Sequence, residues 1–432
     1  MSRNIYSTLL IFFAILLSVP AFSGDQHDHD GHDHSGHNHD HSGHDHDGHD
    51  SHGHVNACGE VVKHDFDPGK AAFHHISDQN IYSIGPLSIP LPCLMYVHGE
   101  GMDIFSSGRF NADGHGTGTK AYNGFVIHEG LVNRIADASF PKGEVELGKD
   151  NVYVLEKEIN GKKKEVVYVC YNGKKWEAEN RSTLDGGMFG GGMTSFTDWS
   201  PTKNVVSMIL ILLFGFFLFR KVANSYATRE GMAPKGTQGF IEPIFLFIQE
   251  EVCKPFLGHK WEKFQPFIMS LFFFILFLNL FGQIPFFGGS NVTGALSVTM
   301  VLAVFTFIVV SFNGNKHYWE HIFWMPGVPA WVKTILTPVE FLGVFIKPLT
   351  LLLRLFGNIT AGHMVIAIFV GLIFVFNNNG ESIPATIGAG IGSTVLTMFM
   401  MAIELLVAFI QAFVFAILTA SYIGAAIEEA HH

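Results

Sequence analysis

The sequence has few charged residues for its length. Of its 432 residues, 15% are charged and 48% are hydrophobic, with 42 phenylalanines. Soluble domains usually carry about a quarter charged residues, which excludes a single soluble domain. The net charge of −11 is unevenly placed, since many acidic residues belong to one segment near the N-terminus. We expect no nucleic acid among the partners.

Cysteine is also scarce, with four in the chain. Cys58, Cys93 and Cys170 precede the apolar part of the sequence, and Cys253 lies within it. An exported region would permit a disulfide among the first three, but an odd count fixes no pairing. At most one bond is expected there.

The first 23 residues have the layout of a cleavable secretory signal. A basic Arg3 precedes an apolar stretch from Leu9 to Val19, and small residues end at Ser23. The alternative is a first membrane helix, but about 11 apolar residues are too few for the roughly 20 that a span requires. We therefore predict a signal peptide over residues 1–23 and export of the region that follows.

Residues 24–60 are rich in His and Asp with almost no apolar side chains, so we expect disorder. Their imidazoles could bind zinc, copper or nickel weakly, without a defined site, or the tract could be a solvated spacer. The candidate weak ligands are His27, His29, His32, His34, His37, His39, His41, His44 and His46.

Residues 61–202 read as a small exported region that contains β-strands. Strand-like runs are expected at Ile81–Ile84, Val152–Leu155 and Val166–Val169. The Gly186–Gly192 stretch resembles a flexible tether to the membrane, because no Lys-Ser/Thr pair follows it as in a phosphate loop. No catalytic constellation stands out, so we expect no cofactor and no catalysis by the chain alone.

Residues 203–432 predict an all-α polytopic membrane domain of five to six helices, the last two forming a long tilted antiparallel hairpin. The apolar segments are Val205–Phe219, Pro266–Phe287, Val292–Phe312, Val339–Phe376 and Ala385–Ala425. The Gly239–Phe256 stretch predicts a helix on the cytoplasmic surface. Lys and Arg in the connections fall on one side if the spans alternate. This predicts a bacterial inner-membrane protein with a periplasmic N-terminal region and a cytoplasmic C-terminus.

Arg354 stands deep in the fourth apolar segment. A charge at the bilayer centre costs at least about 2.5–3.5 kcal/mol, so it needs a partner or a water-filled path. Snorkelling to the interface is the alternative, but Lys347 already lies nearer the cytoplasmic end of that segment. We therefore expect a functional arginine.

The last segment supplies Glu404 and Gln411, seven residues apart and so on one helix face. If the last two segments pair as a hairpin around a turn near Ile383, Arg354 lies level with Gln411 and His363 lies level with Glu404. His363 is then about 13 Å nearer the outside than Arg354, at 1.5 Å per residue.

Glu340 begins the same segment, about 21 Å from Arg354 on the cytoplasmic side. It marks a second access route or an interfacial acid. Asn358 and Gln411 either take part in ion transfer or hydrogen-bond between helices.

These residues resemble subunit a of the F-type ATP synthases, from about Lys203 to His432. The matching motifs are Arg354-Leu355-Phe356-Gly357-Asn358, Ala361-Gly362, Asn279-Leu280, Asn291-Val292-Thr293, Lys347-Pro348 and Gln411-Ala412-Phe413. The exported extension is similar to forms from Bacteroidetes-type bacteria. Some bacterial relatives have an acid where His363 stands and a histidine where Glu404 stands.

The resemblance implies a stator with two offset proton half-channels against a rotating c-ring, whose carboxylates face Arg354. It also implies b subunits of the peripheral stalk and the lipid bilayer as partners, and a proton route past Glu404 and His363 that leaves toward Glu340. Whether the ion is H⁺ or Na⁺ is set mainly by the ring.

Two other classes compete with this interpretation. A zinc transporter would explain the His-rich tract, but Arg354 would repel a divalent ion. A periplasmic metal-binding module merely anchored by helices would leave the intramembrane charges unexplained.

Overall fold

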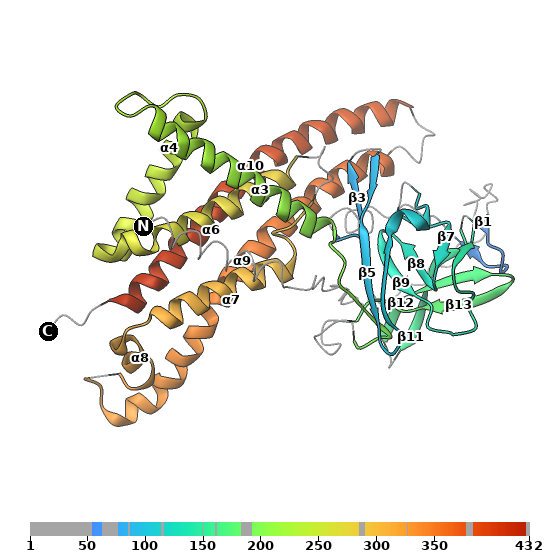
Figure 1. Ribbon diagram of the computed structural model, residues 1–432, viewed down its shortest axis with the longest axis horizontal. Helices are drawn as coiled ribbons and strands as arrows, with labels where there is room; N and C mark the ends of the chain where they lie inside the picture. Colours follow the sequence, from blue (N-terminus) through green and yellow to red (C-terminus); the bar gives the residue numbers. More distant parts are fainter. Residues whose placement is uncertain are drawn as a thin grey trace, which may run out of the picture.

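The computed structural model consists of a β-rich domain at one end and a bundle of helices at the other (Figure 1). The predicted signal peptide and the histidines of the predicted metal-binding tract lie outside the residues that the structure describes. Those residues are 54–62, 77–84, 87–113, 116–148, 150–159, 162–182, 192–284, 290–325, 327–376 and 383–428.

The β-domain contains five small antiparallel sheets. Their orders are β1-β2, β3-β4, β14-β5-β6, β10-β7-β8-β9 and β11-β12-β13. The three predicted strand runs are confirmed as β3 and as parts of β11 and β12. The strands are β1 (His54–Val55), β2 (Val61–Val62), β3 (Ile81–Ile84), β4 (Leu87–Pro90), β5 (Pro92–Val97), β6 (Gly101–Ser106), β7 (Lys120–Tyr122), β8 (Phe125–His128), β9 (Leu131–Arg134), β10 (Glu144–Glu146), β11 (Val152–Ile159), β12 (Lys162–Tyr171), β13 (Lys174–Ala178) and β14 (Phe196–Asp198).

The glycine-rich stretch does not lead directly to the membrane, contrary to the predicted tether over Gly186–Gly192. After it, β14 returns to the domain and pairs with β5, where Phe196 faces Val97 across the strands. Phe196 is fully buried in the domain core. The chain then enters the first helix at Lys203, only a few residues beyond β14.

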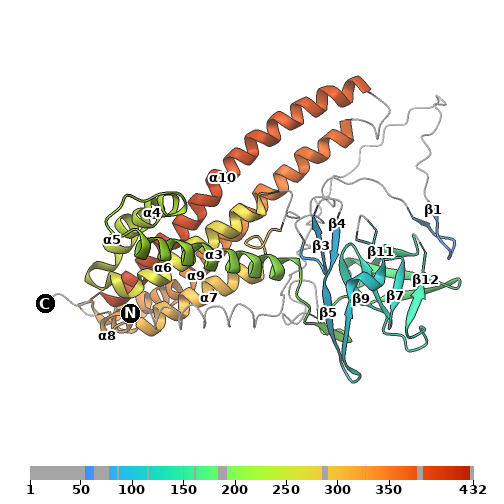
Figure 2. The ribbon, with the colours of Figure 1, turned by 45° about the horizontal axis from the view of Figure 1, so that its top comes forward.

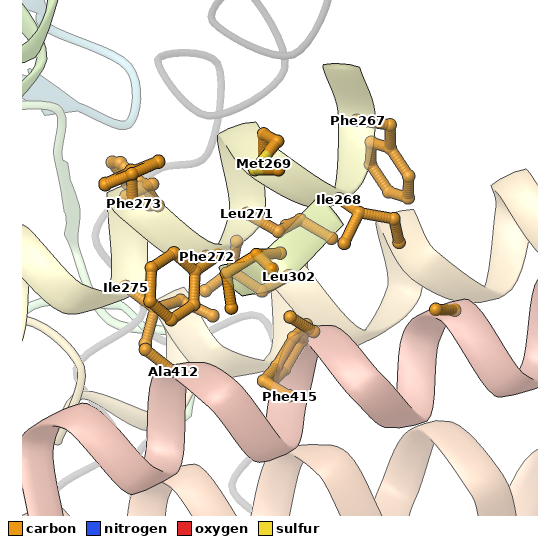
Figure 3. Packing of buried hydrophobic residues seen from close by; sticks show 14 of the residues in the cluster. Phe267, Ile268, Met269, Leu271, Phe272, Phe273, Ile275, Leu302, Ala412 and Phe415 are labelled. Atoms are coloured by element: carbon orange, nitrogen blue, oxygen red, sulfur yellow. The ribbon is translucent and has the colours of Figure 1, made fainter. Parts of the chain in front are cut away.

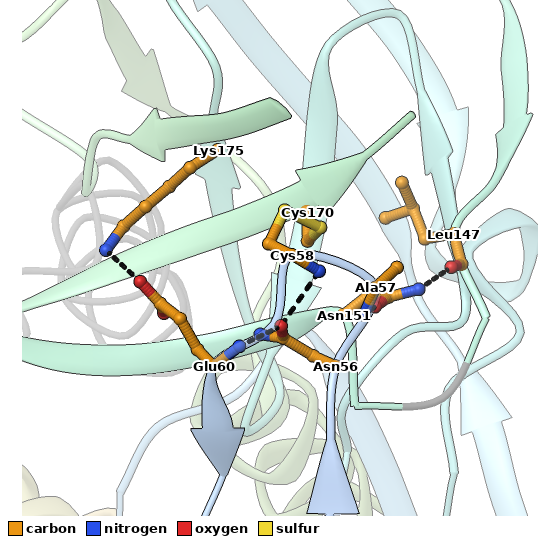
Figure 4. The surroundings of a disulfide bond; sticks show 8 residues. All are labelled: Asn56, Ala57, Cys58, Glu60, Leu147, Asn151, Cys170 and Lys175. Atoms are coloured by element: carbon orange, nitrogen blue, oxygen red, sulfur yellow. Dashed lines mark hydrogen bonds and ion pairs between the residues drawn. A yellow bond between two sulfur atoms is a disulfide. The ribbon is translucent and has the colours of Figure 1, made fainter. Parts of the chain in front are cut away.

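One disulfide, Cys58–Cys170, joins the start of the described chain to β12 (Figure 4). The side-chain oxygen of Asn56 accepts hydrogen bonds from the N–H groups of Cys58 and Glu60, each at 3.0 Å. The folded domain therefore begins before residue 61, although residues 24–60 were predicted to be disordered. Cys93 is buried, and burial, with the nearby negative charge of Asp198, raises the pKa of its thiol to about 12. It therefore stays a protonated thiol.

Among the described residues, five helices are long and apolar enough to cross a membrane, which confirms the predicted fold class. One of these spans, Thr237–Gly282, combines α4 to α6 and includes the stretch predicted as a surface helix. The helical elements are η1 (Ser107–Phe110), α3 (Lys203–Thr228), α4 (Thr237–Ile248), the π-helical η2 (Gln249–Cys253), α5 (Lys254–Leu257), η3 (Gly258–Lys260), α6 (Trp261–Gly282), α7 (Leu296–Asn313), α8 (Lys316–Phe323), α9 (Ala330–Phe376) and α10 (Ile383–Ile427).

The helix α6 is the centre of the bundle and is buried on all sides, as an all-round apolar helix should be. Its Phe272 and Ile275 contact α10 through a run of small residues (Figure 3). That run lies on one face of α10, because its alanines are four residues apart and fully buried: Ala408, Ala412, Ala416 and Ala420. Small side chains let the two backbones approach closely.

The helices α9 and α10 form the long antiparallel hairpin that the sequence predicts, and it extends beyond the rest of the bundle (Figure 2). They contain 47 and 45 residues. At 1.5 Å per residue each is about 70 Å long, more than twice the thickness of a bilayer core. Such helices can cross a membrane only if they are strongly tilted or extend past it.

Candidate functional site

His363 of α9 and Glu404 of α10 meet between the two long helices. Nδ1 of His363 lies 3.6 Å from Oε1 of Glu404, and the two side chains are 13% and 5% exposed. The predicted pairing at equal depth is therefore found in the structure. An imidazole and a carboxylate in contact can pass a proton between them.

Two glycines make room for this pair. Sequence reasoning named Gly362 only as part of the Ala361-Gly362 motif, and it did not single out Gly282. A Cβ on Gly362 would lie 3.0 Å from Oε1 of Glu404. A Cβ on Gly282 would lie 3.5 Å from Nε2 of His363 and 2.9 Å from the carbonyl oxygen of Ser290. The carboxylate and the imidazole thus occupy space that larger residues would fill.

On the ion-transport role that the resemblance implies, we expect Gly362→Leu to abolish transport and Gly362→Ala to reduce it, because the added atoms displace the Glu404 carboxylate from His363. Overpacking of this kind costs about 1–3 kcal/mol, which the assembled complex should survive. The matched control is Gly343→Ala on the same helix, since a Cβ there would meet nothing within 4 Å. ATP-driven acidification of membrane vesicles measures the effect, and unchanged transport in Gly362→Leu would contradict it.

Polar side chains of α6 and the segment before α7 hold α10 in place near the pair. Nε2 of Gln283 donates a 2.7 Å hydrogen bond to the backbone carbonyl of Glu404. Asn279 donates to the carbonyl of Ala408 at 3.2 Å and accepts from Thr293 at 2.7 Å. In the sequence, Asn279 and Gln283 are recognisable only as polar amides near the end of an apolar segment. That pattern alone does not show which group each amide binds.

Arg354 lies on the other flank of α9 from His363, because nine residues are two and a half helical turns. It shares its flank with Glu340, Lys347 and Asn358, which recur at intervals of seven, seven and four residues. Arg354 is half-buried, and Asn358 is exposed. Within the described part of the chain, Arg354 makes no ion pair with a carboxylate.

The equal depth of Arg354 and Gln411 stays a prediction. Gln411 is buried, and no hydrogen bond joins it to Arg354 among the described residues. On α10, the ring of Tyr422 lies 5.7 Å from the ammonium of Lys347, which shares the flank of Arg354. The flank of α9 that carries Arg354 therefore turns toward Tyr422.

Glu340 lies beside the short helix α8. Burial raises the pKa of Tyr318 on that helix, and the negative charge of Glu340 adds to the shift. Glu340 is half-buried. Glu340 precedes His363 by 23 residues on α9, so the two are about 35 Å apart along the helix at 1.5 Å per residue.

Each long helix also exposes an apolar stripe. Leu353, next to Arg354, is 54% exposed, and Leu406, close to Glu404, is 59% exposed. The stripes consist of Leu342, Ile346, Leu349 and Leu353 on α9 and of Val395, Phe399, Leu406 and Ile410 on α10. Such surfaces suit lipid or another apolar protein surface.

Comparisons with known proteins divide the chain in the same way as the structure does. A model of the ATP synthase A chain family matches residues 205–424. A domain of unknown function (DUF8433) matches residues 71–185. The first match covers the membrane helices and every candidate site residue outside the His-rich tract, and the second covers most of the β-domain.

Similar curated proteins carry the name ATP synthase subunit a. The one from Chloroherpeton thalassium is 37% identical over 247 residues, which is 54% of this chain and 69% of that protein. The one from an Anaeromyxobacter species is 39% identical over 248 residues, which is 54% of this chain and 56% of that protein. The one from Myxococcus xanthus is 35% identical over 262 residues, covering 58% and 81%.

Proposed function

The chain belongs to the ATP synthase A chain family, and from this premise we propose that it is subunit a of the Fo sector of an F-type ATP synthase. In this role it catalyses no reaction by itself. It holds two proton half-channels and couples proton movement to rotation of the c-ring, which drives ATP synthesis.

The observation that carries the proposal is a buried acid–imidazole pair on one flank of α9 and, on the other, an arginine that has no carboxylate partner among the described residues. Because an intramembrane cation needs a counter-charge or water, a carboxylate from another chain suits Arg354. A positive charge nearby favours the ionised form of that carboxylate, so its proton leaves.

The proton path then has its inlet on one side of Arg354 and its outlet on the other side. A proton enters past Glu404 and His363, loads a ring carboxylate, travels with the ring and leaves toward Glu340. Asn358 and Gln411 supply polar groups near the arginine. The arginine blocks a direct leak between the two half-channels.

The exposed apolar stripes of α9 and α10 provide surfaces for the c-ring and for lipid. The b subunits of the peripheral stalk complete the set of protein partners. In the inner membrane, the β-domain of residues 61–202 would be periplasmic and the C-terminus would be cytoplasmic, with residues 203–432 forming the channel domain.

Purified complex in vesicles tests this function. ATP should build a pH gradient when this chain is present, whereas a complex without it should hydrolyse ATP and build none. A sodium gradient in place of a pH gradient would show that the coupled ion is Na⁺, and the proposed role as subunit a would stand. Zinc uptake by the chain alone, without an effect on the gradient, would favour the transporter alternative and overturn the proposal.

A further inference from the structure

The β-domain is attached to the helix bundle by buried polar groups. The N–H of Lys203 donates to the carbonyl of Gln79 at 2.8 Å, and the N–H of Asn204 donates to Oδ1 of Asp78 at 3.0 Å. Asp78, Lys203 and Asn204 are all buried. The Asp78 carboxylate thus caps the first turn of α3, where a negative group is favoured. These contacts fix the domain directly over the start of α3.

Three hydroxyl groups connect this junction to the interior of the bundle. Oγ of Ser207 on α3 lies 3.4 Å from the hydroxyl of Tyr82 on β3 and 2.6 Å from Oγ of Ser290. Ser290 also donates to Oδ1 of Asn204 at 3.3 Å. Tyr82, Ser207 and Ser290 are 3%, 0% and 1% exposed, so the string is enclosed by protein along its length.

The string ends beside the His363–Glu404 pair. A Cβ built on Gly282 would touch both the carbonyl oxygen of Ser290 and the Nε2 side of His363. One glycine therefore separates the backbone carbonyl of Ser290 from the imidazole, whose other nitrogen faces Glu404. Tyr82, Ser207, Ser290, His363 and Glu404 thus follow one another from the β-domain into the bundle.

We propose that the β-domain forms the outer wall of the proton inlet, and that the hydroxyls of Tyr82, Ser207 and Ser290 relay protons to His363. The inference rests on the proposed function of the chain. It gives the exported domain a part in ion transfer, because Tyr82 comes from that domain.

The relay conserves protons at each hydroxyl. In the structure Ser290 donates to Ser207 and Ser207 donates to Tyr82, so inward transfer begins when these hydroxyls turn. A proton then binds the oxygen of Tyr82, the Tyr82 hydroxyl proton passes to Ser207, and that of Ser207 passes to Ser290. A hydroxyl can accept and donate at once, so each keeps one proton afterwards. The last step, from Oγ of Ser290 to Nε2 of His363, needs a bridging water, and Nδ1 then releases one proton to the Glu404 carboxylate.

The test compares hydroxyl removal with hydroxyl retention in the complete complex. Tyr82→Phe and Ser207→Ala should each lower ATP-driven proton pumping at least about tenfold, with ATP hydrolysis and assembly unchanged. A positioned proton-transfer group typically contributes about 10²-fold or more. The loss of pumping expected here is smaller, because water can replace part of the relay. Ser207→Thr keeps the hydroxyl and should restore most of the pumping.

Matched controls separate a relay from a structural contact. Ser225→Ala removes a serine of the same helix that bonds to the carbonyl four residues earlier, as Ser207 does, but Ser225 is only half-buried and its hydrogen bond is exposed. Tyr96→Phe removes a hydroxyl from an exposed tyrosine of the same domain. Both should pump as the unmodified complex does.

Two outcomes would overturn the relay. One is normal pumping by Tyr82→Phe and Ser207→Ala, and the other is equal loss in Ser207→Ala and Ser207→Thr. Arg354→Ala is included in the same experiment. If it abolishes pumping while Tyr82→Phe does not, the relay is wrong and the proposed function stands; if Arg354→Ala pumps normally, the proposed function itself fails.

Discussion

Replacing Arg354 with alanine should abolish ATP-driven proton pumping while the complex still assembles and hydrolyses ATP. The guanidinium lies half-buried on a flank of α9 that bears no carboxylate partner among the described residues. Without its charge, a ring carboxylate keeps its proton, because an opposite charge within about 4–6 Å lowers a carboxyl pKa by about 1–3 units. Loss of the barrier between the two half-channels would also let protons leak.

Vesicle acidification on addition of ATP measures this result, with ATP hydrolysis recorded on the same vesicles. Arg220→Ala is the matched control, because Arg220 is an exposed arginine of the membrane helix α3. Arg354→Lys tests geometry, since an ammonium keeps the charge but lacks the planar fork of the guanidinium. Coupled pumping by Arg354→Ala at the normal rate would exclude the proposed mechanism.

The membrane helices were the part of the fold that the sequence predicted best. Long apolar segments have few alternatives in a bilayer, because every backbone group must find its partner within a helix. The predicted boundaries were less accurate. The segment expected over Pro266–Phe287 is α6, which begins at Trp261 and ends at Gly282, before Pro285. A residue just before a proline disfavours helix, so the earlier end has a physical reason.

The β-domain could be predicted only as a set of strands. Its topology depends on pairings between distant segments, such as β14 with β5. The disulfide also joins segments that are distant in the sequence, because Cys58 and Cys170 are 112 residues apart. Nothing in the local sequence distinguishes that pairing from one with Cys93. The fold decides it, because it brings the Cα atoms of Cys58 and Cys170 to 5.9 Å and leaves Cys93 as a free thiol.

The sequence could predict a contact in the site where two residues lie at equal distances on either side of a hairpin turn. His363 and Glu404 satisfy that condition for the α9–α10 hairpin, and they are in contact. Gly282 and Gly362 could not be identified in this way, since a glycine leaves space only relative to a neighbouring helix. The same holds for Ser207 and Ser290, whose contact joins α3 to the segment before α7.

The second large effect concerns the order of acid and imidazole in the pair. His363→Glu alone places two carboxyl groups together, and like charges in contact cannot both ionise. Glu404→His alone leaves two imidazoles and no acid. Each single variant should lower pumping about tenfold or more. The double variant His363→Glu/Glu404→His restores one acid and one imidazole at the same depth, and it should recover at least about half of the original rate.

This recovery has a structural basis in the spaces around the pair. Gly362 lies against residue 404 and Gly282 lies against residue 363, so each position of the exchange has room beside it. Strong non-additivity of this kind is the signature of residues that act as a unit. A double variant that assembles but pumps no better than the singles would show that the two positions have separate roles. Because ATP hydrolysis is measured in the same samples, poor assembly and lost proton transfer give different results.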